Sequence, residues 1–418
     1  MDIRTRISER MRGTKHNAVI KDRRFLDDEQ LIRSEQLELL EEIFNANVRD
    51  REIGEISSHL APIMRNDHPY HLALWGKTGT GKTLTMSYFL RLLAEMCRKE
   101  KIPLRYQQLD LSTARPCFRA LNDLACLLNA SKRYKKGISL EELMLRIEAS
   151  LEDYRGYLIL FVVEVDNVRR DKDTFLAFLI RRLPQRIPAK LILVFASNHL
   201  NWTENLDPRV RSFLKLNELI FEPYDALDLQ KILRIRVEKA LLPDSVEPGV
   251  IEKIAALSSR DHGDARKAVA LLGHSAALAE KEGTKLTLAI VDQAAVEIEQ
   301  DRYMMMIRTA PPHLQAALAA AIDAVRQNHG SAVATGQVYD AYLLFCGKAN
   351  LRPLAVRAFT DLLAELDLYS FLRTRVHSRG RFGRSREVLL ELPEEMIGRL
   401  VETIRLNFEL GGRQTTLL

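Results

Sequence analysis

Short apolar runs and longer amphipathic stretches alternate along the first half of the chain. The apolar runs, which predict buried strands, occupy residues 71–75, 104–111, 157–166 and 190–198. The stretches with apolar residues at helical spacing occupy residues 82–100, 114–128, 140–154 and 174–183. Strands that alternate with helices are typical of a parallel sheet covered on both faces. The pattern therefore predicts an α/β domain over residues 31–224, which begins with helical sequence.

The pattern changes after residue 224. From 225 to 306 the strand-like runs end and helical periodicity predominates, which predicts a separate helical domain. Pro311-Pro312 then interrupts the chain. Beyond it, three helical stretches precede two predicted strands joined by the basic turn HSRGRFGR. This order resembles a winged helix-turn-helix domain over residues 312–418.

The bulk composition is that of an ordinary globular protein, with 46% hydrophobic and 28% charged residues among 418. No apolar run approaches the roughly 18 residues that a membrane helix needs. Residues 1–30 are basic and lack an apolar core, so we expect a flexible basic arm and no secretory signal. The four cysteines lack Cys-x-x-Cys pairing and zinc spacing. We therefore expect reduced thiols in a cytoplasmic protein that does not contact a membrane.

A phosphate-binding motif follows the first predicted strand directly. Residues 76–83, GKTGTGKT, fit the pattern G-x-x-x-x-G-K-[ST] and lead into a long amphipathic helix. The glycines let backbone N–H groups point at phosphates, Lys82 reaches the β/γ-phosphates, and Thr83 offers its hydroxyl to magnesium. A structural Gly-rich turn is the alternative, which the strand–turn–helix context disfavours. We expect ATP or ADP with Mg²⁺ at Gly76, Gly79, Thr80, Gly81, Lys82, Thr83 and Leu84.

The strand that usually supplies a magnesium carboxylate lacks one in this chain. Residues 161–168 read FVVEVDNV, so Val163 stands where P-loop enzymes carry an Asp. Glu164 occupies the position of the residue that polarises the attacking water, and Asp166 follows two residues later. A strand-end acid without a catalytic role is the alternative interpretation. We expect ATP binding with slow hydrolysis, and Glu164 or Asp166 as the groups available to compensate.

Further polar positions are candidates for contact with the γ-phosphate. Asn198 ends a predicted central strand and could orient the attacking water, although an Asn in a turn is the alternative. Arg209 and Arg211 follow a turn, and either could reach a neighbouring molecule's nucleotide as an arginine finger. Exposed surface arginines are the competing interpretation. Arg266 begins a predicted helix, where a cation is unfavourable unless it faces an anion; a solvated face is the alternative.

The motifs, in this order, resemble one family closely. Beside GKTGTGKT and EVDNV, the chain carries SNHLNWTENLDPRVRSFL, GDARKAVALL and RGRFGRSREVLLEL. These motifs resemble those of the archaeal origin recognition and Cdc6-type initiators, AAA+ proteins of the helicase-loader clade. The resemblance spans nearly the whole chain beyond Arg33. It implies an AAA+ P-loop base domain over 31–224, a helical lid over 225–306 and a winged-helix DNA-binding domain over 312–418.

The resemblance also assigns roles to single residues. The positions that match its catalytic glutamate, sensor 1, arginine finger and sensor 2 are Glu164, Asn198, Arg209 and Arg266. Tyr224, between base and lid, and Arg236, in the lid, match a pair that contacts the nucleotide. An aromatic ring and a lid cation at the nucleotide would couple nucleotide state to the lid angle. LIRSEQLELL resembles the segment that lies near the adenine, whereas Val163 departs from the family's usual Asp.

The C-terminal part carries the basic groups expected of a reader of duplex DNA. The chain has a net charge of +6, so DNA binding requires that charge to be concentrated. Six arginines lie between residues 373 and 386 without an acid among them. The candidate DNA contacts are Arg352, Arg357 and Thr360 around the second helix, and Arg379, Arg381 and Arg384 on the wing. A solvated charged face is the alternative. Arg181 and Arg182 fall where the resembled clade carries an extra DNA-contacting helix, although the end of a surface helix is the alternative for RRLPQR.

The sequence thus favours an ATP-binding initiator of DNA replication. The resemblance implies double-stranded origin DNA, the MCM helicase and other initiator copies as partners, and association with the nucleoid. ATP is expected to act mainly as a conformational switch. Two alternatives stay open: a loader that hydrolyses ATP through Arg209 in trans, and a regulator that holds nucleotide permanently and restrains initiation.

Overall fold

The computed structural model describes residues 19–27, 33–113, 115–129, 137–169, 171–204, 206–260, 262–378 and 384–414. The chain divides into two compact units, residues 1–292 and 293–418. No helix among these described residues is long and apolar enough to cross a bilayer.

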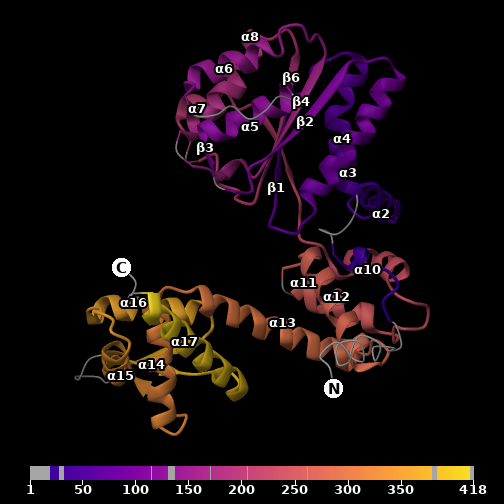
Figure 1. The fold of residues 1–418 in the computed structure, drawn as a ribbon. Helices are drawn as coiled ribbons and strands as arrows, with labels where there is room; N and C mark the ends of the chain where they lie inside the picture. Colours follow the sequence, from indigo (N-terminus) through magenta and orange to yellow (C-terminus); the bar gives the residue numbers. More distant parts are fainter. Residues whose placement is uncertain are drawn as a thin grey trace, which may run out of the picture. The chain divides into compact units, whose positions relative to one another are not determined.

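The first unit is built on a five-stranded parallel sheet of order β2-β4-β6-β1-β7 (Figure 1). Its strands are β1 (His71–Trp75), β2 (Leu104–Asp110), β4 (Tyr157–Val163), β6 (Lys190–Ser197) and β7 (Leu216–Ile220). The sequence pattern misses β7, because this edge strand, LNELI, is largely exposed and has no long apolar run. The predicted α/β class with a parallel sheet is confirmed.

Alternate residues of the interior strand β4 enter two cores on opposite faces of the sheet. Leu158, Leu160 and Val162 join the core beneath α5–α7, whereas Ile159 and Phe161 join the core beneath α3 and α4 (Figure 1). The covering helices are α3 (Asp50–Leu60), α4 (Lys82–Lys99), α5 (Cys117–Asn129), α6 (Leu140–Ala149) and α7 (Lys172–Ala177). A strand buried on both faces needs apolar residues at every position, which is why β4 reads as an uninterrupted apolar run.

Shorter elements complete the base. They are η1 (Arg23–Leu26), α2 (Arg33–Asn45), η2 (Ala61–Arg65), β3 (Arg115–Pro116), η3 (Val165–Asn167), β5 (Val168–Arg169), the π-helical turn η4 (Phe178–Arg182), α8 (Leu183–Arg186) and α9 (Pro208–Phe213). Because the strands are parallel, their C-terminal ends meet at one edge of the sheet. β6 lies between β1 and β4, so Asn198 stands between the P-loop and Glu164.

The lid consists of helices that follow the sheet without intervening strands. They are α10 (Ala226–Ala240), α11 (Val250–Arg260) and α12 (Ala265–Glu282), followed by α13 (Leu288–Thr309), which belongs to the second unit from residue 293 onward. Residues 19–27 pack against this lid, with Ile20 bridging Leu241 and the side chain of Leu26 buried. This part of the expected flexible arm is therefore held on the lid, whereas residues 1–18 and 28–30 lie outside the described residues.

The second unit has the helices and three-stranded sheet of a winged helix-turn-helix, as the sequence predicts. Its elements are α14 (Pro312–Gln327), β8 (Val333–Ala334), α15 (Thr335–Lys348), α16 (Val356–Leu368), β9 (Arg373–Ser378), β10 (Arg384–Leu389) and α17 (Glu394–Gln414). The strand expected from residue 368 begins only at Arg373, because α16 continues to Leu368 and Ser370 adopts a left-handed conformation. The sequence pattern also misses α17.

Candidate functional site

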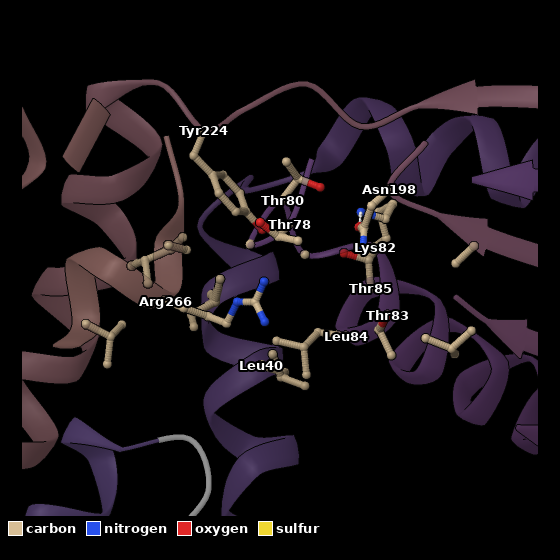
Figure 2. Close-up of a pocket in the computed structure, with 18 of the residues that line it drawn as sticks. Leu40, Thr78, Thr80, Lys82, Thr83, Leu84, Thr85, Asn198, Tyr224 and Arg266 are labelled. Atoms are coloured by element: carbon tan, nitrogen blue, oxygen red, sulfur yellow. Dashed lines mark hydrogen bonds between the residues drawn. The ribbon is translucent and has the colours of Figure 1, made fainter. Parts of the chain in front are cut away.

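The P-loop lysine is held at the C-terminal edge of the sheet before any ligand arrives. Lys82 Nζ donates hydrogen bonds to the carbonyl oxygens of Gly76 (2.7 Å) and Lys77 (2.8 Å) and to Asn198 Oδ1 (3.0 Å). A cavity opens above it, with about 960 Å³ of empty space when its open mouth and adjoining solvent are included. Residues 78–85 line this cavity (Figure 2). A phosphate entering the cavity would replace protein oxygens as the partner of Lys82.

The electrostatics around Lys82 suit an anionic ligand. The pKa of Lys82 is lowered to about 8, mainly because burial disfavours the ammonium ion and next because the Arg266 guanidinium repels it. Glu164 and Asp166 act in the opposite sense and are too weak to restore the ordinary value. A polyphosphate would neutralise both cations at once, so the site is electrostatically incomplete without an anion.

The residues after β4 present one carboxylate to the cavity. Glu164 lines the cavity in a left-handed conformation with φ 55°, and Asn167 Nδ2 donates to its Oε2 at 2.7 Å. Asn198 Nδ2 lies 3.5 Å from Glu164 Oε1. Val163 also lines the cavity but offers only methyl groups. Asp166 Oδ2 lies 3.8 Å from His199 Nε2, and Asp166 is not among the residues that line the cavity.

These donors fit magnesium only in part. The Thr83 hydroxyl and the Glu164 carboxylate both line the cavity. No group of three or more His, Cys, Asp or Glu side chains arranged for a metal ion occurs in the described part of the chain. Because Mg²⁺ requires about six oxygen ligands, most of them would come from the nucleotide and water, with Thr83 as the protein's hydroxyl ligand.

The lid touches the P-loop directly. Ala265 N, at the start of α12, donates to Gly79 O at 3.3 Å. A Cβ at Gly79 would lie 1.8 Å from Asp264 Oδ1, so only glycine fits there. Arg266, in the first turn of α12, extends from the lid toward the P-loop helix (Figure 2). Asp264 caps α12 by accepting a hydrogen bond from Arg266 N at 2.9 Å.

Tyr224 lies where the base joins the lid. Its ring is buried, and its hydroxyl oxygen would lie 2.2 Å from a Cβ at Gly81. Tyr224 N donates to Gly263 O at 3.2 Å, which ties this residue to the turn before α12. Burial raises the pKa of the Tyr224 hydroxyl, so it stays neutral at physiological pH. Tyr224 therefore contacts the P-loop and the lid at the same time.

An apolar wall forms part of the cavity lining. Leu40, Ile43 and Phe44 of α2 and Ile232 and Val269 of the lid form this wall. Apolar surfaces of this kind suit a planar base. The first of these residues, Leu40, ends the LIRSEQLELL stretch that resembles an adenine-side segment.

Arg236 also lines the cavity, as the family resemblance implies. Its residue exposure is 5%, and its guanidinium donates to Phe25 O at 2.8 Å. It thus links the cavity wall to the segment 19–27 that packs on the lid.

Arg209, the predicted arginine finger, is not among the residues that line the nucleotide cavity of its own chain. Arg209 begins α9 and lines a separate groove with Phe213 and Arg181, and Arg211 is exposed. Arg181 stacks on the Phe213 ring at 5.1 Å. Arg182 forms ion pairs with Glu141 (2.7 Å) and Glu148 (2.6 Å), which raise its pKa. Arg182 is therefore engaged inside the base, and Arg181 is the more available of the two cations proposed for DNA.

The C-terminal unit exposes part of the predicted DNA-contacting set. Arg352 and Arg357 are exposed around the start of α16, and Thr360 is half-buried and donates to Val356 O. On the hairpin, Arg373 pairs with Glu391 at 2.9 Å, and Arg375 lies opposite Glu387 in register. Arg384 begins β10, whereas Arg379 and Arg381 lie outside the described residues.

Arg49 contacts both the P-loop and the base–lid junction, although no sequence motif marks it. It lies between α2 and α3, with a residue exposure of 6%. The surrounding sequence, NVRDRE, is typical of the charged start of a surface helix. No local signal marks this arginine, because its partners come from distant parts of the chain.

Comparisons with known proteins agree over most of the chain. The family models described as AAA domain, Cdc6 AAA+ ATPase-type lid domain and CDC6, C terminal winged helix domain match residues 65–201, 230–295 and 305–399. The chain is 33% identical over 351 residues to ORC1-type DNA replication protein 1 of Sulfurisphaera tokodaii, covering 84% of this chain and 87% of that protein. It is 32% identical over 355 residues to the protein of the same name from Archaeoglobus fulgidus, covering 85% and 86%.

A solved structure shows the same similarity in three dimensions. The Aeropyrum pernix ORC1 protein, solved in complex with DNA, superposes with a TM-score of 0.70 at 28% identity, covering 96% of this chain and 99% of that one. Cdc6p from Pyrobaculum aerophilum, at 20% identity and a TM-score of 0.56, shows a similar fold.

Proposed function

The chain belongs to the family of ORC1-type DNA replication proteins, and from that premise we propose that it is an ATP-switched initiator. In this proposal it binds double-stranded origin DNA through its C-terminal unit and helps to recruit the MCM helicase. The solved relative in complex with DNA supports the first part. MCM recruitment is what membership of an initiator family implies.

The contact between lid and P-loop carries the proposal. Ala265 N donates to Gly79 O, and Tyr224 fits against Gly81, so the backbone that would bind phosphates also touches the lid. A nucleotide that reorients this backbone must change at least one of these contacts. ATP can therefore act as a ligand that selects a lid position, because it interacts differently with the two arrangements.

Hydrolysis is expected to be slow. Thr83 and the nucleotide's phosphates would hold Mg²⁺. A bound Mg²⁺ would neutralise charge on the transferred phosphoryl group. Val163 cannot add the usual carboxylate, whereas Glu164 is placed to polarise a water and Asn198 to orient it. We expect Val163→Asp to raise single-turnover hydrolysis, with Val163→Asn as the matched polar control without charge. Equal hydrolysis by all three proteins would mean that residue 163 does not face the metal.

DNA binding measured in each nucleotide state tests the switch. We expect wild-type protein to bind an origin fragment with different affinity in ATP, in ADP and without nucleotide, and Lys82→Ala to lose this difference. Identical affinities for wild type in all three states would refute the switch. Pull-down of purified MCM by DNA-bound protein, compared in ATP and ADP, tests the recruitment step separately.

The second candidate function is a regulator that holds its nucleotide permanently and restrains initiation, and Val163 is the residue that favours it. A protein that cannot complete its metal shell could keep its nucleotide indefinitely and act on DNA without cycling. Retention of bound ADP over hours, with DNA affinity independent of added ATP, would favour this alternative over the switch.

A further inference from the structure

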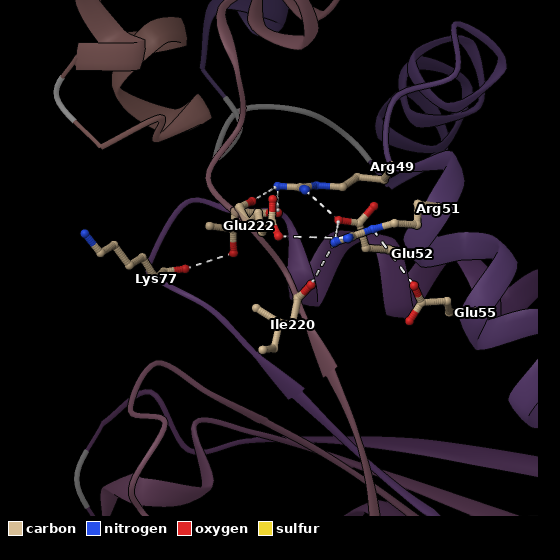
Figure 3. Close-up of polar contacts among 8 residues, drawn as sticks. Arg49, Arg51, Glu52, Glu55, Lys77, Ile220 and Glu222 are labelled. Carbon is tan, nitrogen blue, oxygen red and sulfur yellow. Dashed lines mark hydrogen bonds and ion pairs between the residues drawn. The ribbon is translucent and has the colours of Figure 1, made fainter.

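One buried arginine joins three segments around the P-loop. Arg49 donates from one terminal nitrogen, Nη2, to Thr80 O at 2.9 Å and to Glu222 O at 2.6 Å (Figure 3). Its other terminal nitrogen, Nη1, donates to Glu52 Oε1 at 2.8 Å. Thr80 belongs to the phosphate cradle, and Glu222 belongs to the linker that leads from β7 to the lid. A single guanidinium group thus bridges the cradle and the linker.

The same guanidinium stacks on the aromatic side chain at the lid junction. Arg49 Cζ lies 3.9 Å from the centroid of the Tyr224 ring, and the hydroxyl end of this ring approaches Gly81 of the P-loop. Tyr224 therefore contacts both Arg49 and the P-loop backbone. A shift of the Thr80 carbonyl would change the direction of the guanidinium, and the planar stack would transmit this change to Tyr224.

Stability alone does not account for this arrangement. Arg49 adopts a left-handed backbone conformation with φ 63°, which is unfavourable for a residue with a Cβ. Its Nε is buried and has no hydrogen-bond partner among the described residues. Burial of an ion pair often gives little net stabilisation relative to apolar replacements. Such features are typical of a group retained for its position.

We propose that Arg49 is a positioning residue that couples the conformation of the phosphate cradle to the base–lid junction. It is not among the residues that line the nucleotide cavity, so it would act through Thr80 O and Tyr224. The proposal rests on the proposed nucleotide switch. It predicts that loss of Arg49 reduces the response of DNA affinity to ATP more than it reduces ATP affinity itself.

Lysine cannot replace this guanidinium. Its ammonium group carries a similar charge, but it lacks the planar fork that reaches Glu52 and the two carbonyls and stacks on the Tyr224 ring. The Arg49→Lys variant therefore keeps the positive charge but loses the planar group that makes the hydrogen bonds and the ring stack. Arg51, two residues further on in the first turn of α3, is the matched control, since its side chain is 56% exposed and its ion pairs span 3.4–3.9 Å.

The test compares wild type with Arg49→Lys, Arg49→Met, Arg51→Ala and the double variant Arg49→Met/Glu52→Leu. The double variant removes both buried charges together, so it stays folded if an unpaired Glu52 is what destabilises the single variant. For each protein, ATP affinity is measured by calorimetry, and affinity for one duplex is measured with and without ATP. The ratio of these two duplex affinities is the coupling factor, and thermal melting reports the fold.

Coupling factors between allosteric sites are typically about 5–150-fold. We expect Arg49→Lys and the double variant to bring this factor close to one with unchanged melting temperature, while ATP affinity falls by no more than about threefold. Arg51→Ala should keep the wild-type factor. An undiminished factor in folded Arg49→Lys and double variants would overturn the proposal. A wild-type factor of one would instead refute the nucleotide switch itself.

Discussion

The nucleotide side of the molecule and its C-terminal unit hold their cations in opposite ways. In the base and lid, Lys82, Arg49 and Arg236 are buried, and each donates to protein oxygens. In the C-terminal unit, Arg352 and Arg357 stand exposed at the start of α16. A buried cation must be paired, so its position is fixed before a ligand arrives, whereas an exposed side chain is ordered at binding. The base is therefore preorganised for a small anion, and the C-terminal unit suits an extended polyanion.

Removal of Lys82 has the largest expected effect on this comparison. We expect Lys82→Ala to weaken ATP binding by about 100-fold, because hydrogen bonds from a charged donor are worth about 1.5–3 kcal/mol. Calorimetric titration of the full chain measures the change. Lys77→Ala is the matched control, since Lys77 belongs to the same motif but is not among the residues that line the cavity. Equal losses in both variants would indicate a general collapse of the P-loop.

The wing tip gives the second largest expected effect. We expect the double replacement Arg381→Ala and Arg384→Ala to lower the salt dependence of duplex binding by about 1.8 in log–log slope, and affinity by about 50-fold at about 0.1 M salt, if each arginine meets one phosphate. Arg373→Ala is the control, because Arg373 is already paired with Glu391 at 2.9 Å. An unaltered slope in the double variant would remove the wing tip from the interface.

The two units also differ in how many of their functional contacts could be predicted from the sequence. The P-loop is a contiguous motif between a strand and a helix, so its contacts follow from local sequence. Arg49 was not predictable, because its hydrogen bonds join residues 31 and 173 positions apart. Tyr224 and Arg236 came only from the family resemblance, since an isolated aromatic or helix charge carries no local signal. On the wing, the arginine run was evident, but the partners Glu391 and Glu387 depend on strand register.

A partly buried histidine in the base is expected to make the stability of the first unit sensitive to acid. His71 Nδ1 accepts a hydrogen bond from Leu193 N at 3.2 Å, and burial, with His68 and His59 nearby, lowers its pKa to about 4. The unfolded chain has a His pKa near 6.5 and so binds more protons between these values. Stability from this group is full above about pH 6.5 and is lost as pH falls toward 4, by about 2 kcal/mol at pH 5.

The tryptophans allow this acid effect to be assigned to the base. The chain has two tryptophans, Trp75 and Trp202, and both are buried in the base core. Denaturant unfolding followed by their fluorescence therefore reports the first unit. We expect the pH 5 destabilisation to be smaller in His71→Asn, which cannot titrate. A pH dependence identical to that of wild type would assign the acid sensitivity to other groups.

The effect of alkaline pH on ATP affinity is the smallest of the expected effects. It tests directly whether Lys82 carries its charge before ATP binds. Free Lys82 has a pKa of about 8, and bound phosphates must raise it, so ATP binding at high pH takes up a proton. We expect ATP affinity to fall by about tenfold between pH 7 and pH 9, because one site must be protonated on binding. Lys82→Arg should bind more weakly overall but without this pH dependence, since guanidinium stays charged. Calorimetry in buffers of different ionisation enthalpy counts the protons, and zero uptake at pH 9 would show that Lys82 is already fully charged in the free protein.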